Sequence, residues 1–161
     1  MTRIAITTTA LLLGAVALVP AAQGASGANR WATVNVCDTA RHPNEMGVRA
    51  RMPGDGTRGK MYMRFTAQYR TSSGWRRVSG ESSSGWLSAG SSMFRYQERG
   101  FTFKFDPPPA GTSYLMRGVV NLQWRDRQGK VEHRRRLITE GGHPSRGADP
   151  KRFSAARCRI A

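Results

Sequence analysis

Alternation of apolar and polar residues is the dominant pattern of this chain after residue 30. The clearest example is segment 61–70, whose odd-numbered residues are Met61, Met63, Phe65, Ala67 and Tyr69, while its even-numbered residues are mostly polar. Because successive side chains of a strand point to opposite faces, this period of two predicts a β-strand with one buried face. In segment 31–37 the same rule places Ala32, Val34 and Val36 together on one face.

Further segments of this kind are separated by turn-forming residues such as Pro53-Gly54-Asp55-Gly56. They lie at 46–52, 75–78, 93–96, 101–105, 114–125 and 131–139, and a last short segment carries Cys158 and Ile160. About seven short strands at fairly even spacing predict an all-β fold, an antiparallel β-sandwich. The Ser/Gly-rich stretch 79–92 leaves two possibilities open, a short edge strand or a flexible crossing, and the strand order there undetermined.

Two parts of the chain resemble fibronectin type III domains, which are immunoglobulin-like sandwiches. Residues 65–70 with 75–78 are similar to that family's third strand and hairpin, and residues 109–121 resemble its sixth strand, with Tyr114 at the tyrosine-corner position. The resemblance implies a fibronectin type III-like β-sandwich and a binding or spacer module rather than an enzyme. The chain departs from the family in segment 45–52, which lacks the expected tryptophan, and in its long tail.

The first 28 residues differ from the rest of the chain. Arg3 precedes an apolar run at 4–19, which Pro20 and small residues follow as far as Ala28. This order predicts a secretory signal peptide over residues 1–28, cleaved between Gly24 and Ala28, and therefore a secreted or envelope-associated protein. An uncleaved membrane anchor is the alternative, because the run is near the shortest spanning length. No second apolar run of that length follows, so we expect no stable membrane insertion after cleavage.

Residues 29–161 have the length of one domain. Their two cysteines, Cys37 and Cys158, form an even pair in a chain predicted to be exported. We therefore predict one disulfide that ties the first strand to the C-terminal tail. The alternative is a zinc site that adds His42 to the two thiolates, but this set is incomplete and has no Cys-x-x-Cys spacing.

Positive charge is the strongest feature of the composition. Lysine and arginine number 26 against 10 aspartate and glutamate residues, which gives a net charge of +16. Such an excess is typical of proteins that associate with nucleic acid, phosphate-rich wall polymers or anionic lipid surfaces. The alternative is a structural or protein-interaction domain of the cell envelope whose charge is incidental and serves solubility.

The resemblance implies that strands at 61–70, 113–125 and 130–138 share one sheet. Their outward positions then carry six arginines, namely Arg64, Arg70, Arg117, Arg125, Arg134 and Arg136. Like charges on neighbouring strands repel unless an anion covers them, and arginine forks match phosphate and carboxylate groups. We therefore predict an arginine-rich sheet face that binds an anionic polymer or an acidic protein; a solvated charged face is the alternative.

Candidate catalytic residues form no recognisable constellation. The serines between Gly80 and Gly85 lack the Gly-x-Ser-x-Gly spacing of a nucleophile elbow. His42, His133 and His143 have no partner at a spacing that suggests acid–base chemistry. We expect a non-catalytic protein without cofactor or metal, whose oligomeric state the sequence leaves open.

The four tryptophans divide into two groups. Trp31 and Trp124 follow the alternation of their segments and are expected in or beside the core. Trp75 and Trp86 stand beside glycines at loop boundaries and are the better surface candidates.

Overall fold

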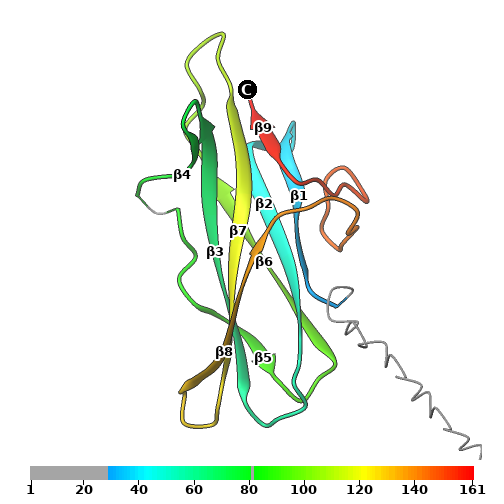
Figure 1. Ribbon diagram of the computed structural model, residues 1–161. Coiled ribbons are helices and arrows are strands. Elements are labelled where there is room, and N and C mark those ends of the chain that lie inside the picture. Colours follow the sequence, from blue (N-terminus) through cyan, green and yellow to red (C-terminus); the bar gives the residue numbers. More distant parts are fainter. Residues whose placement is uncertain (1–28, 81) are drawn as a thin grey trace, which may run out of the picture.

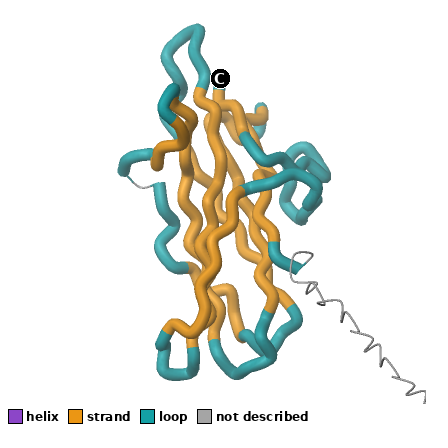
Figure 2. Tube along the Cα trace, in the orientation of Figure 1, coloured by secondary structure: helices purple, strands orange, loops and turns teal. Residues whose placement is uncertain are grey.

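A computed structural model describes residues 29–80 and 82–161 (Figure 1). The predicted signal peptide, residues 1–28, lies outside the described residues. The described part of the chain consists of strands and loops without a helix (Figure 2) and accordingly holds no helix long and apolar enough to cross a membrane. The strands are β1 (Trp31–Thr39), β2 (His42–Pro53), β3 (Lys60–Thr71), β4 (Gly74–Arg77), β5 (Leu87–Ser91), β6 (Tyr96–Lys104), β7 (Tyr114–Arg125), β8 (Val131–Ile138) and β9 (Cys158–Ile160).

The strands form two antiparallel sheets that share one core. The smaller sheet has the order β1-β2-β6, and the larger has the order β4-β3-β7-β8. In the larger sheet β5 also pairs with β3 and β9 with β7. The longest uninterrupted pairing of the larger sheet joins β3 to β7, from Lys60 opposite Arg125 to Tyr69 opposite Met116. The all-β prediction is confirmed, with nine strands in the described residues where about seven were expected.

The core between the sheets is rich in methionine. Five methionines are at most 2% exposed: Met46, Met52, Met61, Met63 and Met116. Their unbranched side chains fill the irregular space between two twisted sheets. Trp124 belongs to this core, as predicted. Val48 of the other sheet packs closely against Gly118, because this residue has no side chain. A Cβ on Gly118 would lie 2.8 Å from a Val48 methyl carbon.

β1 departs from simple alternation at a β-bulge. The register shifts between Val34 and Val36, so Asn35 is an extra residue in this strand. The extra residue reverses the direction in which the following side chains point. Val36 therefore lies outside the core cluster, and the prediction that it shares a face with Ala32 and Val34 is wrong. The same reversal turns Cys37 toward the core, opposite a buried residue of β2.

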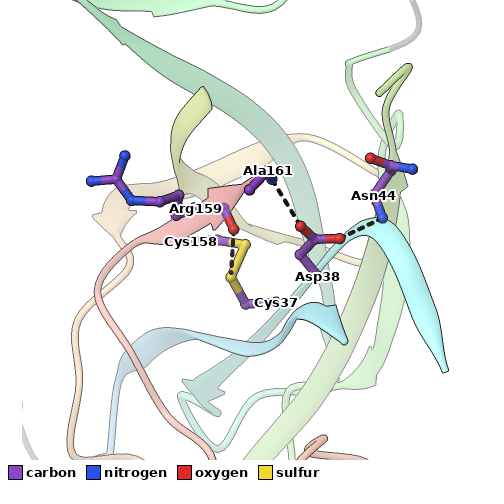
Figure 3. The surroundings of a disulfide bond; sticks show 6 residues. All are labelled: Cys37, Asp38, Asn44, Cys158, Arg159 and Ala161. Atoms are coloured by element: carbon purple, nitrogen blue, oxygen red, sulfur yellow. Dashed lines mark hydrogen bonds between the residues drawn. A yellow bond between two sulfur atoms is a disulfide. The ribbon is translucent and has the colours of Figure 1, made fainter. Parts of the chain in front are cut away.

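The predicted disulfide is confirmed (Figure 3). It joins Cys37 of β1 to Cys158 of β9, with a Cα–Cα distance of 5.3 Å. Because these strands belong to different sheets, the bond links the two layers of the sandwich. Beside it, the Asp38 carboxylate accepts hydrogen bonds from the backbone N–H of Asn44 at 2.7 Å and of Ala161 at 2.9 Å. The C-terminus is thereby tied to the β1–β2 turn.

Between β8 and β9 the tail runs along the outer edge of β1, on the side of the molecule away from β4 (Figure 1). The backbones of Val34 and Ala155 exchange two hydrogen bonds, of 2.9 and 3.0 Å. The Asp149 carboxylate accepts hydrogen bonds from the Thr39 hydroxyl at 2.7 Å and from the Arg41 guanidinium. The tail thus occupies a strand edge that would otherwise be open to pairing with another chain.

The Ser/Gly-rich stretch contains an edge strand, the first of the two possibilities left open. β5 pairs with the segment Lys60–Met63 of β3, and Ser83 forms a single bridge with Thr66. β4 pairs with the other end of β3, from Gln68 to Thr71. Three short pieces of chain therefore cover one edge of β3.

The predicted strand at 93–96 is wrong. The segment is the turn between β5 and β6, and β6 begins only at Tyr96. Met93 and Phe94 are exposed there, so their apolar character does not reflect burial. Four residues are too few for alternation to distinguish a strand from a turn.

We predict that the disulfide contributes much of the stability of the sandwich. Its two cysteines are 121 residues apart, and closing so long a loop restricts the unfolded chain by up to about 5 kcal/mol in the chain-entropy account. The variant Cys37→Ser/Cys158→Ser should therefore unfold at much lower urea concentration than the oxidised protein. Wild-type protein treated with dithiothreitol is the control and should match the variant. Equal urea midpoints for oxidised protein and variant would contradict the prediction.

Asp149 should make the attachment of the tail sensitive to acid. Hydrogen bonds from Arg41 and Thr39 hold the pKa of the Asp149 carboxyl below its ordinary value. A depressed pKa in the folded state stabilises the fold above about pH 4, and this stabilisation is lost as pH falls through the folded-state pKa. The variant Asp149→Asn should thus lose more stability relative to wild type at pH 7 than at pH 3. Urea midpoints at both pH values measure this, and an equal loss at both would refute it.

Candidate arginine-rich binding face

The structure places all six predicted arginines on the outer face of the larger sheet. Neighbouring strands bring them into transverse rows: Arg64 lies opposite Asn121, which lies opposite Arg136, and Gln123 lies opposite Arg134. We call the surface formed by Arg64, Arg70, Arg117, Arg125, Arg134 and Arg136 the arginine face. Four of its members are exposed and two, Arg117 and Arg125, are half-buried.

Two further arginines, which the sequence analysis missed, extend this surface. Arg77 of β4 lies opposite Gln68 on β3, and Arg157 of the tail packs over the Trp75 ring. Arg77 is two residues after Trp75, so both side chains point to the same face of a strand. This spacing was a signal that could have placed Arg77 on the outer face. Arg157 had no such signal, because its position depends on the path of the tail.

The first of two clusters on the arginine face is built around Trp75. The guanidinium carbon of Arg117 lies 4.3 Å from the centroid of the indole ring, and those of Arg70 and Arg157 lie 5.8 Å from it. Arg117 also donates a hydrogen bond of 2.9 Å from Nε to the Gln68 side-chain oxygen. One aromatic ring thus supports three cations through its electron-rich face.

The second cluster is built around Tyr62 and Trp86. The guanidinium carbon of Arg125 lies 4.1 Å from the Tyr62 ring centroid and 5.5 Å from that of Trp86, and Arg64 lies 4.8 Å from Trp86. Arg125 donates two hydrogen bonds, of 3.0 and 2.7 Å, to the Gln123 side-chain oxygen. Both surface tryptophans are therefore half-buried beneath arginine side chains.

A pocket of about 340 Å³ opens on this face beside the second cluster. Its lining includes Arg64, Trp86, Asn121, Gln123 and Arg134. The lining also includes Arg135, so the pocket combines three guanidinium groups with two side-chain amides. All of these groups can donate hydrogen bonds to an anion. This chemistry suits a phosphate or carboxylate group.

Carboxylates do not balance the charge of this surface within residues 29–80 and 82–161. The ion pairs there are Arg41–Asp149, Arg49–Glu98, Arg51–Glu98, His42–Glu45 and His143–Glu140, none of which includes a member of the arginine face. Burial lowers the pKa of Arg117, and the positive charges of Arg136, Arg157 and Arg70 lower it further. Arg117 remains charged at neutral pH. Burial is the larger cause of the shift, and repulsion by the three neighbouring arginines adds to it.

Two histidines have partners that the sequence analysis did not identify. A ring nitrogen of His42 lies 3.0 Å from the Glu45 carboxylate, and one of His143 lies 3.0 Å from that of Glu140. The spacing of three residues in each pair was the available signal.

His143 also stacks on Trp31, with ring centroids 5.2 Å apart. Trp31 is therefore buried on the outer side of the smaller sheet and not in the core cluster.

We predict that repulsion at Arg117 makes the stability of the fold depend on salt. The variant Arg117→Met keeps the apolar part of the side chain and removes one of four neighbouring positive charges. Salt stabilises the wild type by screening the repulsion between these arginines, and the variant has less of this repulsion. Raising NaCl from 20 to 300 mM should therefore increase the melting temperature of the variant less than that of wild type.

The matched control is Arg49→Met, which removes an arginine paired with Glu98 at 3.1 Å on the smaller sheet. Arg49→Met removes the attraction between Arg49 and Glu98, which salt would otherwise weaken. The melting temperature of this variant should therefore rise with salt at least as much as that of wild type. Identical salt responses of wild type and Arg117→Met would show that the face carries no net repulsion at this position.

Comparison of the chain with protein-family models, with curated proteins and with solved structures finds no match.

Proposed function

We propose that this protein is a secreted, non-catalytic module that binds anionic envelope or extracellular polymers through its arginine face. The observation that carries the proposal is the gathering of six arginines on one sheet face, where the described residues provide no carboxylate partner. Like charges on adjacent strands destabilise a sheet. An anion that covers them removes this repulsion and is held by the same charges.

The aromatic rings beneath the arginines favour the binding of an anionic polymer. A guanidinium group stacked on an aromatic ring uses its flat face for the ring, which leaves in-plane N–H groups for phosphate or carboxylate oxygens. The guanidinium carbon of Arg64 lies 4.8 Å from the centroid of Trp86, and those of Arg117 and Arg70 lie 4.3 and 5.8 Å from that of Trp75. Their geometry is thus partly fixed before a ligand arrives, which lowers the entropy lost on binding.

The length of the face favours a polymer over a small anion. β3 and β7 each contain 12 residues, which corresponds to about 40 Å at the usual rise per residue. The Trp75 and Trp86 clusters lie toward opposite ends of this length. A chain that carries a phosphate or uronate on each repeat can contact both clusters and the pocket at once.

We further propose that the sandwich is of the fibronectin type III kind. In immunoglobulin-like domains the first, second and fifth main strands form one sheet, and the third, sixth and seventh form the other. When β5 is set aside and β4 is counted as the fourth strand, β6, β7 and β8 are the fifth, sixth and seventh, and the orders β1-β2-β6 and β3-β7-β8 follow this arrangement. The tail and β9 are then additions to the common pattern.

The proposal predicts salt-dependent binding that three arginines control. Purified protein should bind polyphosphate, polygalacturonate or isolated envelope polymers at 20 mM NaCl and lose at least 100-fold in affinity by 300 mM, because binding releases counterions. The variant Arg64→Ser/Arg117→Ser/Arg134→Ser should lose the binding while its far-UV circular dichroism stays unchanged. Titration calorimetry or immobilised-polymer binding gives the affinities.

The matched control, Arg127→Ser/Arg146→Ser/Lys151→Ser, removes the same charge from exposed positions off the face. It should retain most of the affinity. An equal loss in both triple variants would show that total charge acts instead of the face. Binding that salt does not weaken would favour the alternative, a structural or protein-interaction domain whose charge is incidental.

A further inference from the structure

The turn between β5 and β6 presents large apolar side chains to solvent. Met93 is 59% exposed, Phe94 60% and Tyr96 40%. In Figure 1 this turn lies at the lower end of the sandwich, the end at which the β2–β3 and β7–β8 loops also lie. We call this end, with its three loops, the tip.

The turn is held in place by many hydrogen bonds. Ser92, next to the exposed pair, is 1% exposed, and its hydroxyl donates a hydrogen bond of 2.6 Å to Asp55. Backbone N–H groups of Gly54 and Gly56 donate to the carbonyl oxygens of Arg95 and Ser92, at 3.1 and 3.0 Å. The exposure of Met93 and Phe94 is therefore not caused by a loose turn. The surrounding structure fixes the backbone in a position that points them outward.

Basic residues lie at the same end of the sandwich as these apolar side chains. The three loops at the tip carry Arg58, Arg95, Arg127 and Lys130, and Lys60 is the first residue of β3 at the same end. Their two acidic residues, Asp55 and Asp126, accept hydrogen bonds within the loops, from Thr57 and Ser92 and from Gln128 and Lys130. The tip thus combines exposed apolar side chains with an excess of positive charge.

We propose that the tip docks reversibly on the surface of an anionic lipid bilayer. Phe and Met side chains gain free energy when they enter the boundary between headgroups and acyl chains, while lysine and arginine at the same depth are attracted to lipid phosphates. This is peripheral contact and leaves no segment across the membrane. It uses other residues than the arginine face, so each of the two proposals can fail alone.

A protein occupant fits the tip less well. Two adjacent side chains on one turn offer far less area than the 1,200 Å² or so that a stable protein interface buries. A second copy of this chain would also bring the same excess of positive charge against the first. A bilayer imposes neither limit, because it surrounds a protrusion and supplies the opposite charge.

The test compares binding to phosphatidylcholine vesicles with about 30% phosphatidylglycerol and to vesicles of phosphatidylcholine alone, at 150 mM NaCl. Purified protein should float with the anionic vesicles. The variant Met93→Ser/Phe94→Ser should bind them at least tenfold more weakly and should keep its affinity for polyphosphate. The matched control is Ile138→Ser, which removes a side chain that is 42% exposed on the arginine-face side of β8 and should bind vesicles as wild type does.

A local readout separates contact at the tip from contact at the arginine face. In Phe94→Trp, vesicles with brominated acyl chains should quench the new tryptophan, whereas the new tryptophan of Ile138→Trp should remain unquenched. All variants have the same N-terminal residues. Differences in vesicle binding between the variants therefore report on positions 93, 94 and 138 alone. Equal binding of wild type and Met93→Ser/Phe94→Ser would overturn the proposal. So would quenching at position 138 without quenching at position 94, or no binding to anionic vesicles.

Discussion

β3 and β7 pair without interruption from Lys60–Arg125 to Tyr69–Met116, and this ladder decides what both faces of the larger sheet contain. A shift of one residue would send the arginines into the core and the methionines into solvent, so burial of the apolar set fixes the register. The other strands of this sheet pair with one of these two. The spacing of the clusters on the arginine face is likewise a consequence of this single pairing.

The fold tolerates repulsion on the arginine face because its opposite face is strongly stabilising. Unfavourable charge pairs across strands are worth roughly 0.2–1 kcal/mol each, whereas burying one large apolar side chain contributes about 1.5–3 kcal/mol. Phe65, Met63 and Leu122 lie fully buried on the inner side of the same two strands. Rings and amide oxygens beneath the guanidinium groups offset part of the remaining repulsion. The sheet can therefore hold an uncompensated charge pattern, and a ligand can use it.

Alternation was enough to predict most of the sandwich, because strands with one buried face leave this pattern in any sequence. The disulfide was predicted from an even pair of cysteines in a chain expected to be exported. The bulge at Asn35 was not predictable, since an extra residue leaves no local mark in the sequence, yet it is what turns Cys37 inward. The sheet assignment of the six arginines came from the family resemblance. Their pairing with Trp75 and Trp86 required the structure, because these rings come from a different part of the chain.

The arginine face and the tip are continuous in space, which bears on how they would act together. Lys60 begins β3 at the tip and lies opposite Arg125 of the face, so positive charge extends from one surface to the other. If the tip rests on a bilayer, β3 and β7 lead away from it, and the face reaches about 40 Å from the lipid surface. A polymer bound along the face would then run outward from the membrane. The two interactions also differ in range: charge attracts over a Debye length, about 8 Å at physiological salt, while the apolar side chains act only on contact. The charges would therefore bring the protein to an anionic envelope, and the tip would set its orientation there.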